Sequence, residues 1–546
     1  MIIQQTATDG SRDRSSFAIA PFPARWRFPL QLSLICMGAG FLSVMLGPDN
    51  YWDLRYYHLY APWGYLHDRY LYDIGPAQEE GFLNPVADFL LYGLISSPLN
   101  ETPRIVSFVM GAVHGINAAL IFAIARRVIR PPDPMECSTL IAVAWLMGVS
   151  GGGFLSLLGT SSNDLTSALF VLGSLLGVLN AADRPVGSGT WRVFAVAGLL
   201  AGFGIALKYT SAMFAPGLGI AAALAAWRQK TAGALIVFGV AATFGFIAVA
   251  AHHMLTLWND FGNPVFPYMN QIFRSPYFEP SEIVEDRFLQ RDLWSLITFP
   301  FSWTRLDAYV VIEPAFRDWR AAIAYVAMAA GVGAFAVRSL RNGNPRREVC
   351  AQTRGLDLVF IFVVVSYFAW ARASGYYRYV IPLELLTGVV TMGALIWLVE
   401  NRRVRLVVAF MVSAIVAITT VYPDWGRRQY GDRYVDVHVP PLPPNSVVLI
   451  ATEEPVSYFI PFAEPKAQYV GIENNYLRLS QDNKLASKVK EVMRTPGRPK
   501  FVLDVDGAKP DAVLRQLGLT LGASPCRPIR SNLEGHILRL CPLTDD

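Results

Sequence analysis

The amino-acid sequence predicts a polytopic α-helical membrane protein with a small α/β domain at its C-terminal end. Charged residues make up only 16% of the 546 residues, whereas soluble globular domains carry about a quarter. Apolar residues make up 53% and are gathered in long runs. After Pro423 these runs stop and the composition becomes that of a water-soluble chain. Together the three observations predict a membrane body followed by a soluble domain.

The long apolar runs set the number of membrane-spanning helices. A helix that crosses the bilayer core needs about 20 mostly apolar residues, and the runs predict about eleven such spans. The first run, Phe28–Leu46, is longer than the roughly 7–15 apolar residues of a signal peptide, so it is expected to remain as an uncleaved helix. The predicted spans are residues 28–47, 105–125, 138–158, 165–181, 193–207, 210–227, 231–254, 321–338, 356–371, 380–399 and 404–422.

Arginines gather in alternate loops between these runs, as in Arg126, Arg127 and Arg130. By the positive-inside rule these loops are cytoplasmic, and so is the N-terminal segment, residues 1–27. An odd number of spans then places the C-terminal domain outside, in the periplasm if the membrane is a bacterial inner membrane. The net charge of +5 lies largely in these loops, so the bilayer, and not a nucleic acid, is the expected partner.

The predicted organisation has a membrane domain at residues 28–422 and a soluble periplasmic α/β domain at 423–546. Two long outside loops interrupt the membrane domain, at 47–104 and 255–320. In the first loop, the apolar stretch 82–95 is too short for a span and is expected to form interfacial or re-entrant helices.

The C-terminal part alternates predicted strands and helices, which indicates an α/β domain. Two cysteines, Cys526 and Cys541, fall within it. Because disulfides persist outside the cytoplasm, we expect these two to pair, with two buried free thiols as the alternative. The expected strands are 446–451, 501–505 and 536–541, and the expected helices are 484–493 and 511–517.

The stretch that follows the first span, Pro48–His58, holds the most informative charges. Asp49 and Asp53 lie four positions apart and would share one face of a helix. A carboxylate at a water–membrane boundary could act as a general base on a sugar hydroxyl. A solvated loop with an Asp–Arg pair is the alternative reading of the same residues.

Two further charges stand at predicted helix ends on the outside. Asn163 and Asp164 lie at the outside end of the fourth predicted span, where they could do no more than cap the helix. Lys208 is the only charge in the apolar stretch from Val193 to Trp227. A phosphate at the membrane surface needs such a cation, although a lysine that snorkels to the interface would look the same.

Arg372 and Arg378 bracket a tyrosine-containing turn at the outside end of the ninth predicted span. Arginine can bind phosphate through two parallel hydrogen bonds, or it can anchor an aromatic belt at the interface. The histidines show no ligand spacing typical of a metal site. Whether a divalent cation such as Mg²⁺ or Mn²⁺ takes part is therefore left open.

An acidic residue just after the first span, followed by tyrosines in a long outside loop, resembles the membrane glycosyltransferases of the GT-C superfamily. Asp53, in Asp53-Leu54-Arg55-Tyr56-Tyr57, fits the position of the family's catalytic aspartate, and Asp49 is the runner-up. The resemblance covers residues 28–422. It implies donor-phosphate binding by Lys208, Arg378 and Arg372, and acceptor binding by Asp164, Asn163, Tyr56, Tyr57 and His58.

The resemblance implies transfer of a sugar from a polyprenyl-phosphate donor to a lipid, glycan or protein acceptor outside the cytoplasm. A transporter or flippase of a lipid-linked saccharide is the first alternative, and an enzyme like an O-antigen ligase or polymerase is the second. Transporters place charges within broken helices of repeated halves. Here the charges lie at the outer ends of the predicted spans and no internal repeat is evident, which favours an enzyme.

Overall fold

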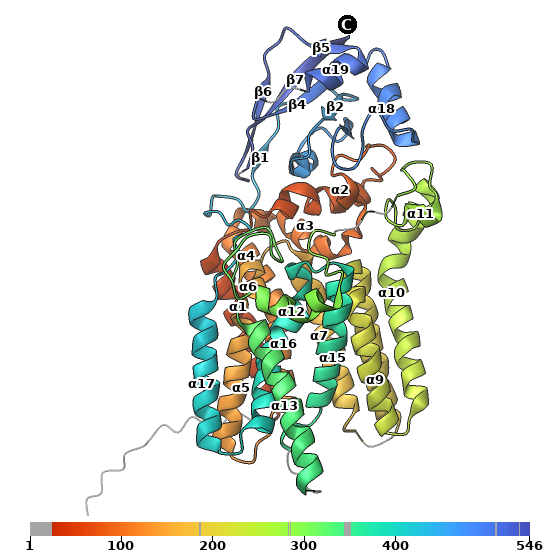
Figure 1. Ribbon diagram of the computed structural model, residues 1–546. Helices are drawn as coiled ribbons and strands as arrows, with labels where there is room; N and C mark the ends of the chain where they lie inside the picture. Colours follow the sequence, from red (N-terminus) through yellow and green to blue (C-terminus); the bar gives the residue numbers. More distant parts are fainter. Residues whose placement is uncertain are drawn as a thin grey trace, which may run out of the picture.

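The computed structural model describes residues 24–184, 187–281, 283, 286–342, 351–507, 510–533 and 535–545. Most of the expected cytoplasmic segment, residues 1–27, therefore lies outside the described residues. A bundle of long helices forms the lower part of the molecule, short helices of the two long loops lie above it, and the C-terminal domain stands on top (Figure 1). This arrangement places the loops between two larger bodies.

Nine helices of the described chain are long and apolar enough to cross a membrane, which makes this a multi-pass membrane protein. Two of them begin as a tighter turn, η5 (Tyr209–Phe214) before α9 and η6 (Tyr377–Val380) before α16. The nine are α1 (Ala24–Leu46), α4 (Pro103–Val128), α7 (Asn163–Ala181), α8 (Ser188–Leu207), α9 (Ala215–Arg228), α10 (Ala232–Phe261), α13 (Arg320–Asn342), α15 (Leu356–Ala373) and α16 (Ile381–Leu398).

The other two expected spans form helices that differ from the prediction. The span at 138–158 becomes α5 (Pro134–Val149), which has 16 residues, and α6 (Gly152–Leu157) after a break. A Cβ atom at Gly151 would lie 1.8 Å from a Glu384 carboxylate oxygen, so glycine is needed at this break. The span at 404–422 becomes α17 (Arg402–Thr419), whose first turn contains arginines. α5 packs on the central helix of the bundle, and α17 packs on α5 (Figure 1).

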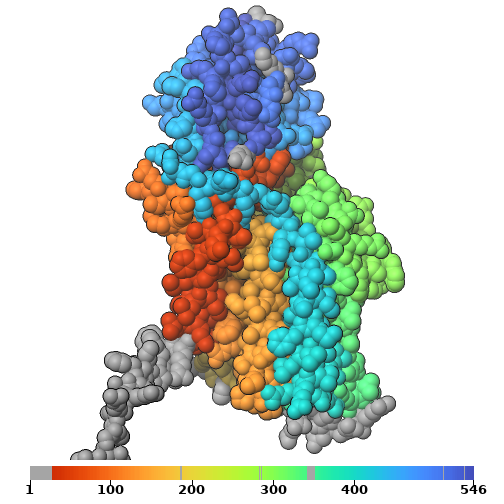
Figure 2. Space-filling model, turned by 90° about the vertical axis from the view of Figure 1, so that its left-hand side faces the viewer, coloured from red at the N-terminus to blue at the C-terminus, as the bar shows by residue number. Residues whose placement is uncertain are grey.

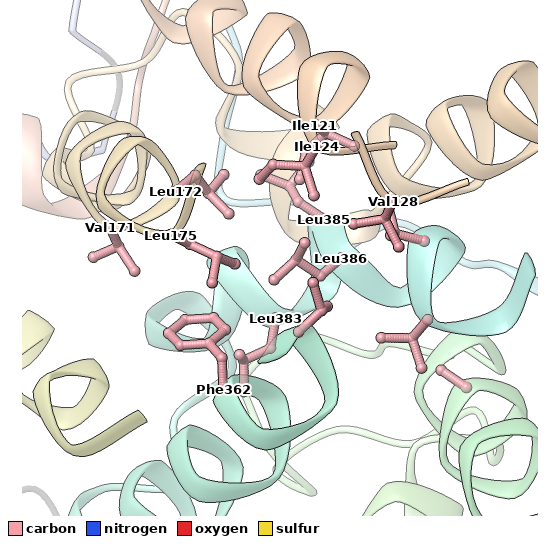
Figure 3. Close-up of a cluster of buried hydrophobic side chains, with 14 of the residues drawn as sticks. Ile121, Ile124, Val128, Val171, Leu172, Leu175, Phe362, Leu383, Leu385 and Leu386 are labelled. Atoms are coloured by element: carbon pink, nitrogen blue, oxygen red, sulfur yellow. The ribbon is translucent and has the colours of Figure 1, made fainter. Parts of the chain in front are cut away.

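α16 runs through the centre of the bundle, and its apolar window is completely buried. Two glycines allow it to approach α5: a Cβ atom at Gly388 would lie 2.0 Å from the carbonyl oxygen of Ala144, and one at Gly148 would lie 2.3 Å from that of Leu385. Leu385 and Leu386 point into a cluster of side chains from α4, α7 and α15 (Figure 3). A helix that is apolar on all sides is expected in such a central position.

The first long loop folds into short helices above the bundle. The apolar stretch 82–95 forms no span, as expected, and gives η3 (Pro85–Asp88) and α3 (Phe89–Ile95). The remaining elements of this loop are η1 (Leu54–His58), a single π-helical turn, α2 (Tyr60–Leu66), η2 (Glu79–Phe82) and η4 (Pro98–Glu101). The second long loop contains α11 (Asn270–Phe273) and α12 (Leu293–Ser302).

The C-terminal domain is a mixed sheet in the order β1-β6-β7-β4-β2-β3, with β5 paired to β7. β2 pairs in parallel with β3 and β4, and the other pairs are antiparallel. The predicted strands and helices of this α/β domain are confirmed. The elements are β1 (Val437–His438), β2 (Val447–Ile450), η7 (Ser457–Phe462), β3 (Gln468–Gly471), α18 (Lys484–Arg494), β4 (Lys500–Val505), α19 (Asp511–Leu517), β5 (Leu519–Leu521), β6 (Arg527–Ser531) and β7 (Leu538–Asp545).

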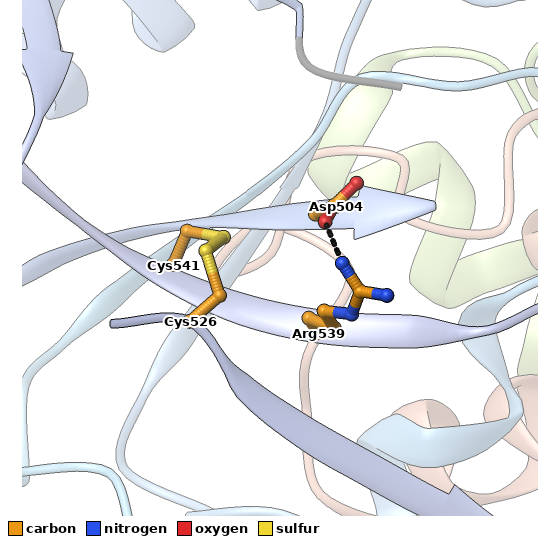
Figure 4. The surroundings of a disulfide bond; sticks show 4 residues. All are labelled: Asp504, Cys526, Arg539 and Cys541. Atoms are coloured by element: carbon orange, nitrogen blue, oxygen red, sulfur yellow. Dashed lines mark ion pairs between the residues drawn. A yellow bond between two sulfur atoms is a disulfide. The ribbon is translucent and has the colours of Figure 1, made fainter. Parts of the chain in front are cut away.

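A disulfide joins Cys526 and Cys541, with the two Cα atoms 4.1 Å apart, and confirms the predicted pairing. It ties the residue before β6 to the middle of β7 (Figure 4). The neighbouring strand β4 carries Asp504, which lies 3.5 Å from Arg539. The bond therefore cross-links two strands that are already neighbours in the sheet.

The C-terminal domain rests directly on the first loop, as the blue and red surfaces in Figure 2 show. Ile74 pairs with Val470, so this loop extends the sheet beside β3. Next to it, the buried Asp73 carboxylate accepts hydrogen bonds from Arg69, from the Tyr60 hydroxyl and from the Tyr469 amide. The loop is thus held at a fixed place between sheet and bundle.

Candidate active site

Asp53 and Arg378 form an ion pair at the end of the bundle that faces the C-terminal domain. Oδ2 of Asp53 lies 2.8 Å from Nη1 of Arg378, and their side chains are 14% and 9% exposed. Asp53 precedes η1, and Arg378 lies in the turn η6. The Arg378 guanidinium also lies 4.9 Å from the ring of Tyr51 and 5.0 Å from that of Tyr376. These rings and the carboxylate hold the guanidinium in place.

A second ion pair joins Asp164 and Lys208, with Oδ1 and Nζ 2.6 Å apart. The Ser162 hydroxyl donates to the other Asp164 oxygen at 2.8 Å and caps α7, so neither Asn163 nor Asp164 is the cap. Nζ of Lys208 lies 4.9 Å from the ring of Tyr379, the residue after Arg378. The two pairs are therefore neighbours around η6.

His58 lies beside these pairs and bonds to Asp88, an acidic residue that the sequence analysis did not single out. Nδ1 of His58 and Oδ1 of Asp88 are 2.6 Å apart, and the Asn163 side chain donates to the same oxygen at 2.9 Å. Burial lowers the pKa of His58, but the Asp88 carboxylate outweighs burial and the pKa is raised. Nε2 of His58 has no hydrogen-bond partner in the described chain.

Asp49 has a different environment from Asp53. Its two oxygens accept the backbone amides of Tyr51 at 2.8 Å and Ser161 at 2.7 Å, and the residue has no exposed surface. This carboxylate ties the start of the first loop to the turn before α7. Of the two aspartates four positions apart, the structure brings only Asp53 to Lys208 and Arg378.

The ionisation of Asp53 differs from that of an ordinary aspartate. Burial raises its pKa to about 6, with His58 and Lys208 opposing this and Asp164 and Asp49 adding to it. The carboxylate is thus charged at neutral pH and holds a proton better than a solvated aspartate does. A raised pKa that stays below the working pH suits a general base.

Tyr57 and Tyr56 point to different partners. The ring of Tyr57 lies against that of His58, with centroids 4.2 Å apart and the planes tilted by 43°. Tyr56 faces Glu80, and both Glu79 and Glu80 have a buried carboxylate oxygen without a hydrogen-bond partner. Burial raises the pKa of both glutamates. The sequence analysis missed this acidic pair, although two adjacent carboxylates before an apolar stretch were visible in the sequence.

Arg372, the third predicted phosphate ligand, lies elsewhere. Its guanidinium donates to the backbone oxygens of Gln290 at 2.9 Å and Arg291 at 2.6 Å, in the second long loop. The structure therefore uses Arg372 to hold this loop against the end of α15. It does not bring Arg372 to the pairs formed by Asp53 and Asp164.

Two groups of residues bear on metal binding. Within the described chain, Asp504, Cys526 and Cys541 are close enough to share an ion, but the two sulfurs are bonded to each other. Glu79 and Glu80 offer two carboxylates near the site, and carboxylates suit Mg²⁺ or Mn²⁺. In the described chain, however, these two glutamates are not part of a cluster of three or more possible ligands.

No family model and no curated protein matches the chain. Crystal structures of ArnT from Cupriavidus metallidurans, bound to undecaprenyl phosphate and in the apo state, align with 95% of this chain and 98% of theirs. The identity is 12% and the TM-scores are 0.40 and 0.38. A crystal structure of the Archaeoglobus fulgidus oligosaccharyltransferase, tethered with an acceptor peptide, aligns with 88% of this chain and 70% of that one at 12% identity, with a TM-score of 0.41. The function proposed below rests on the geometry of the site.

Proposed function

We propose that this protein is a membrane glycosyltransferase that moves a sugar from a polyprenyl-phosphate donor to a lipid, glycan or protein acceptor outside the cytoplasm. One observation carries the proposal. A buried carboxylate with a raised pKa, Asp53, pairs with Arg378 and lies near the ion pair of Lys208 with Asp164, at the end of a membrane-spanning bundle. A base and a phosphate-binding pair are the two parts that such a transfer needs.

The position of the cations suits a donor whose chain lies in the bilayer. Lys208 directly follows the long apolar helix α8. Arg378 lies in η6, directly before the long apolar helix α16. A polyprenyl chain would remain among the helices while its phosphate reaches the two cations at the membrane boundary. In the free protein Asp164 and Asp53 neutralise these cations, and the phosphate oxygens would replace the carboxylates as their partners.

The reaction then follows from the charges. Asp53 accepts the proton of an acceptor hydroxyl, whose oxygen forms a bond to C1 of the sugar. The bond between C1 and the phosphate oxygen breaks, and the polyprenyl phosphate leaves with the electron pair. Its negative charge grows during this step, and Lys208 and Arg378 stabilise it.

The acceptor is proposed to enter beside His58 and Asn163. Nε2 of His58 is unpartnered in the described chain, and the ring of Tyr57 lies against it. A hydroxyl could bond to this nitrogen, and a sugar ring could stack on the aromatic side chain. Asp164, through Ser162 and Lys208, would fix the boundary between acceptor and donor.

We further propose that the C-terminal domain lies outside the cytoplasm and the N-terminus inside. The disulfide in this domain is stable in an oxidising compartment, and the arginine-rich loops lie at the opposite end of the bundle. Labelling of an introduced cysteine in the loop after α18 by a membrane-impermeant maleimide on intact cells would support this orientation. Labelling only after lysis would contradict it.

The decisive test is transfer of radiolabelled sugar from synthetic polyprenyl-phosphate donors by the purified protein in lipid. We expect transfer by the wild-type protein and its loss in Asp53→Asn. Absence of transfer across a broad donor and acceptor panel, together with flipping of a lipid-linked saccharide in the same vesicles, would replace this proposal with the transporter.

A further inference from the structure

A cavity of about 290 Å³ lies within the bundle and does not include Asp53, Lys208 or Arg378. α16 forms its floor, α13 and α15 form its walls, and α12 lies across its upper end (Figure 1). Its lining is almost entirely apolar. Representative lining residues are Ala324, Met328, Val363, Tyr367, Leu383 and Val390.

The cavity has the form of a groove along the helices. Along the end of η6 and α16 the lining residues Val380, Leu383, Thr387 and Val390 recur every three or four positions, so they lie on one face. They span roughly 15 Å at about 1.5 Å per residue. α13 and α15 both pack on α16, while the described chain shows no extensive packing of α13 on α15. The groove therefore opens sideways, toward the bilayer.

α15 separates this groove from the proposed donor site. Phe362 and Ser366 face α9, where they contact Gly217. Val363 and Tyr367, which are turned away by about 100° per residue, line the groove. Lys208 directly precedes η5 and α9, so it lies on the side of α15 that carries Phe362 and Ser366. A donor whose phosphate binds Lys208 would thus extend its chain along the other side of α15.

The upper end of the groove is polar, and its charged side chains already have partners, although the Trp303 indole N–H has no hydrogen-bond partner in the described chain. Arg320 donates to the backbone oxygens of Met147 and Ser150, each at 2.8 Å, and Asp318 lies 2.5 Å from it. Glu384 accepts two backbone amides at 3.0 Å and the Tyr377 hydroxyl. One guanidinium faces two carboxylates here, so this end is not complementary to an anionic phosphate. The groove suits a hydrocarbon chain and no headgroup.

We propose that this groove binds one acyl chain of a bilayer phospholipid, at a site distinct from that of the donor. The occupant also supports the active site, because Tyr377 lines the groove while the next residue, Arg378, pairs with Asp53. An acyl chain in the groove packs against Tyr377 and thereby supports the turn η6. The binding part of this inference does not rest on the proposed function.

The test is photolabelling of the full-length protein in vesicles that contain a phospholipid with a diazirine on its acyl chain. Labelled peptides are mapped by mass spectrometry, and groove-facing residues of α13 and α15 are expected to be modified. Ala324→Phe and, independently, Val363→Phe fill the groove and should lower this labelling at least fivefold. Ala330→Phe, at an exposed position of α13 outside the lining, should leave it unchanged.

Two results would overturn the inference. Labelling of the groove that is equal in wild type, Ala324→Phe and Val363→Phe would show that no chain enters it. Stronger labelling of the same residues by a photoactivatable polyprenyl phosphate than by the phospholipid would assign the groove to the donor. The thermal unfolding of each variant in detergent verifies that folded proteins are compared, and the second variant serves if the first does not fold.

Discussion

Oδ2 of Asp53 lies 2.8 Å from Nη1 of Arg378 although the two residues are 325 positions apart. The pair joins the first long loop to the turn before the central helix α16. It orients the Asp53 carboxylate, and it neutralises a buried guanidinium until a substrate is present. An ion pair with one partner removed is costly in such surroundings, so both residues are expected to be sensitive to substitution.

Replacement of the proposed base is the first prediction. Asp53→Asn keeps the size of the side chain but cannot accept a proton, and we expect transfer to fall by about 10²–10⁴-fold. The measurement is the initial rate with saturating donor and acceptor. Unaltered transfer by Asp53→Asn would exclude Asp53 as the base.

Asp49→Asn is the matched control for this substitution. In the wild-type protein Asp49 accepts hydrogen bonds from two backbone amides. In the variant one of these amides would face the NH₂ group of the asparagine, which costs about 1–3 kcal/mol of stability. We expect a lower unfolding temperature and nearly normal transfer per folded molecule. A loss of transfer without a loss of stability would instead assign the base to Asp49.

The pH dependence follows from the environment of Asp53. Burial raises the pKa of this carboxyl to about 6, and the base must be deprotonated to act. Activity at subsaturating substrate should therefore be level above this pKa and fall about tenfold per pH unit well below it. The residual activity of Asp53→Asn should not show this decrease at low pH. A wild-type rate that is constant from pH 7 to pH 4.5 would contradict the assignment.

The ion pair of Lys208 and Asp164 allows structure and function to be separated. Lys208→Met leaves the Asp164 carboxylate buried without its cation, and loss of one partner of a buried pair costs about 3–5 kcal/mol. The double variant Lys208→Met with Asp164→Asn should recover most of that stability, but it should not recover transfer, because the phosphate still lacks its cation. Thermal unfolding and transfer are measured on the wild type, on Lys208→Met and on the double variant. Recovery of both properties would show that Lys208 has only a structural role.

The helical part of the fold could be read from the sequence because a membrane span must be apolar along its whole length. The prediction of spans from hydropathy is less accurate at α5 and α17. The hydropathy of 138–158 continues across Gly151, but Glu384 approaches the chain at that point and divides the helix. This contact could not be predicted from the hydropathy of residues 138–158, because Glu384 belongs to α16, a helix distant in the sequence.

The candidate site was predictable only in part, for the same reason. Isolated charges such as Lys208 and Asp164 stand out at the ends of apolar runs, and both lie in the site. Their pairing, and that of Asp53 with Arg378, depends on how helices distant in the sequence pack. Asp88 is likewise the only charge in an apolar stretch, but its partner His58 is 30 positions away and only the fold brings the two together. Arg372 met the same criteria as Arg378, and only the fold shows that it binds the second loop.

Asp73 is predicted to hold the C-terminal domain to the membrane body. Asp73→Ala removes the acceptor of hydrogen bonds from Arg69, Tyr60 and Tyr469, and the uncompensated Arg69 should cost about 3–5 kcal/mol. We expect faster hydrogen exchange in β3. Tyr72→Phe, which removes one exposed hydrogen bond to the backbone of Lys466, should change stability by no more than about 0.5 kcal/mol. Equal exchange rates in both variants would contradict this role for Asp73.

The disulfide gives the last prediction. Cys526 and Cys541 are separated by 15 positions, and closing a loop of that length stabilises a domain by about 3 kcal/mol in the chain-entropy account. Cys526→Ser and Cys541→Ser should each destabilise the C-terminal domain by a similar amount, and the double variant should add little more, because the bond is lost once. The membrane helices should keep their unfolding temperature if they unfold independently. A thiol titration of the denatured, non-reduced protein checks the premise, since neither Cys526 nor Cys541 should react, and alkylation of both would exclude the bond.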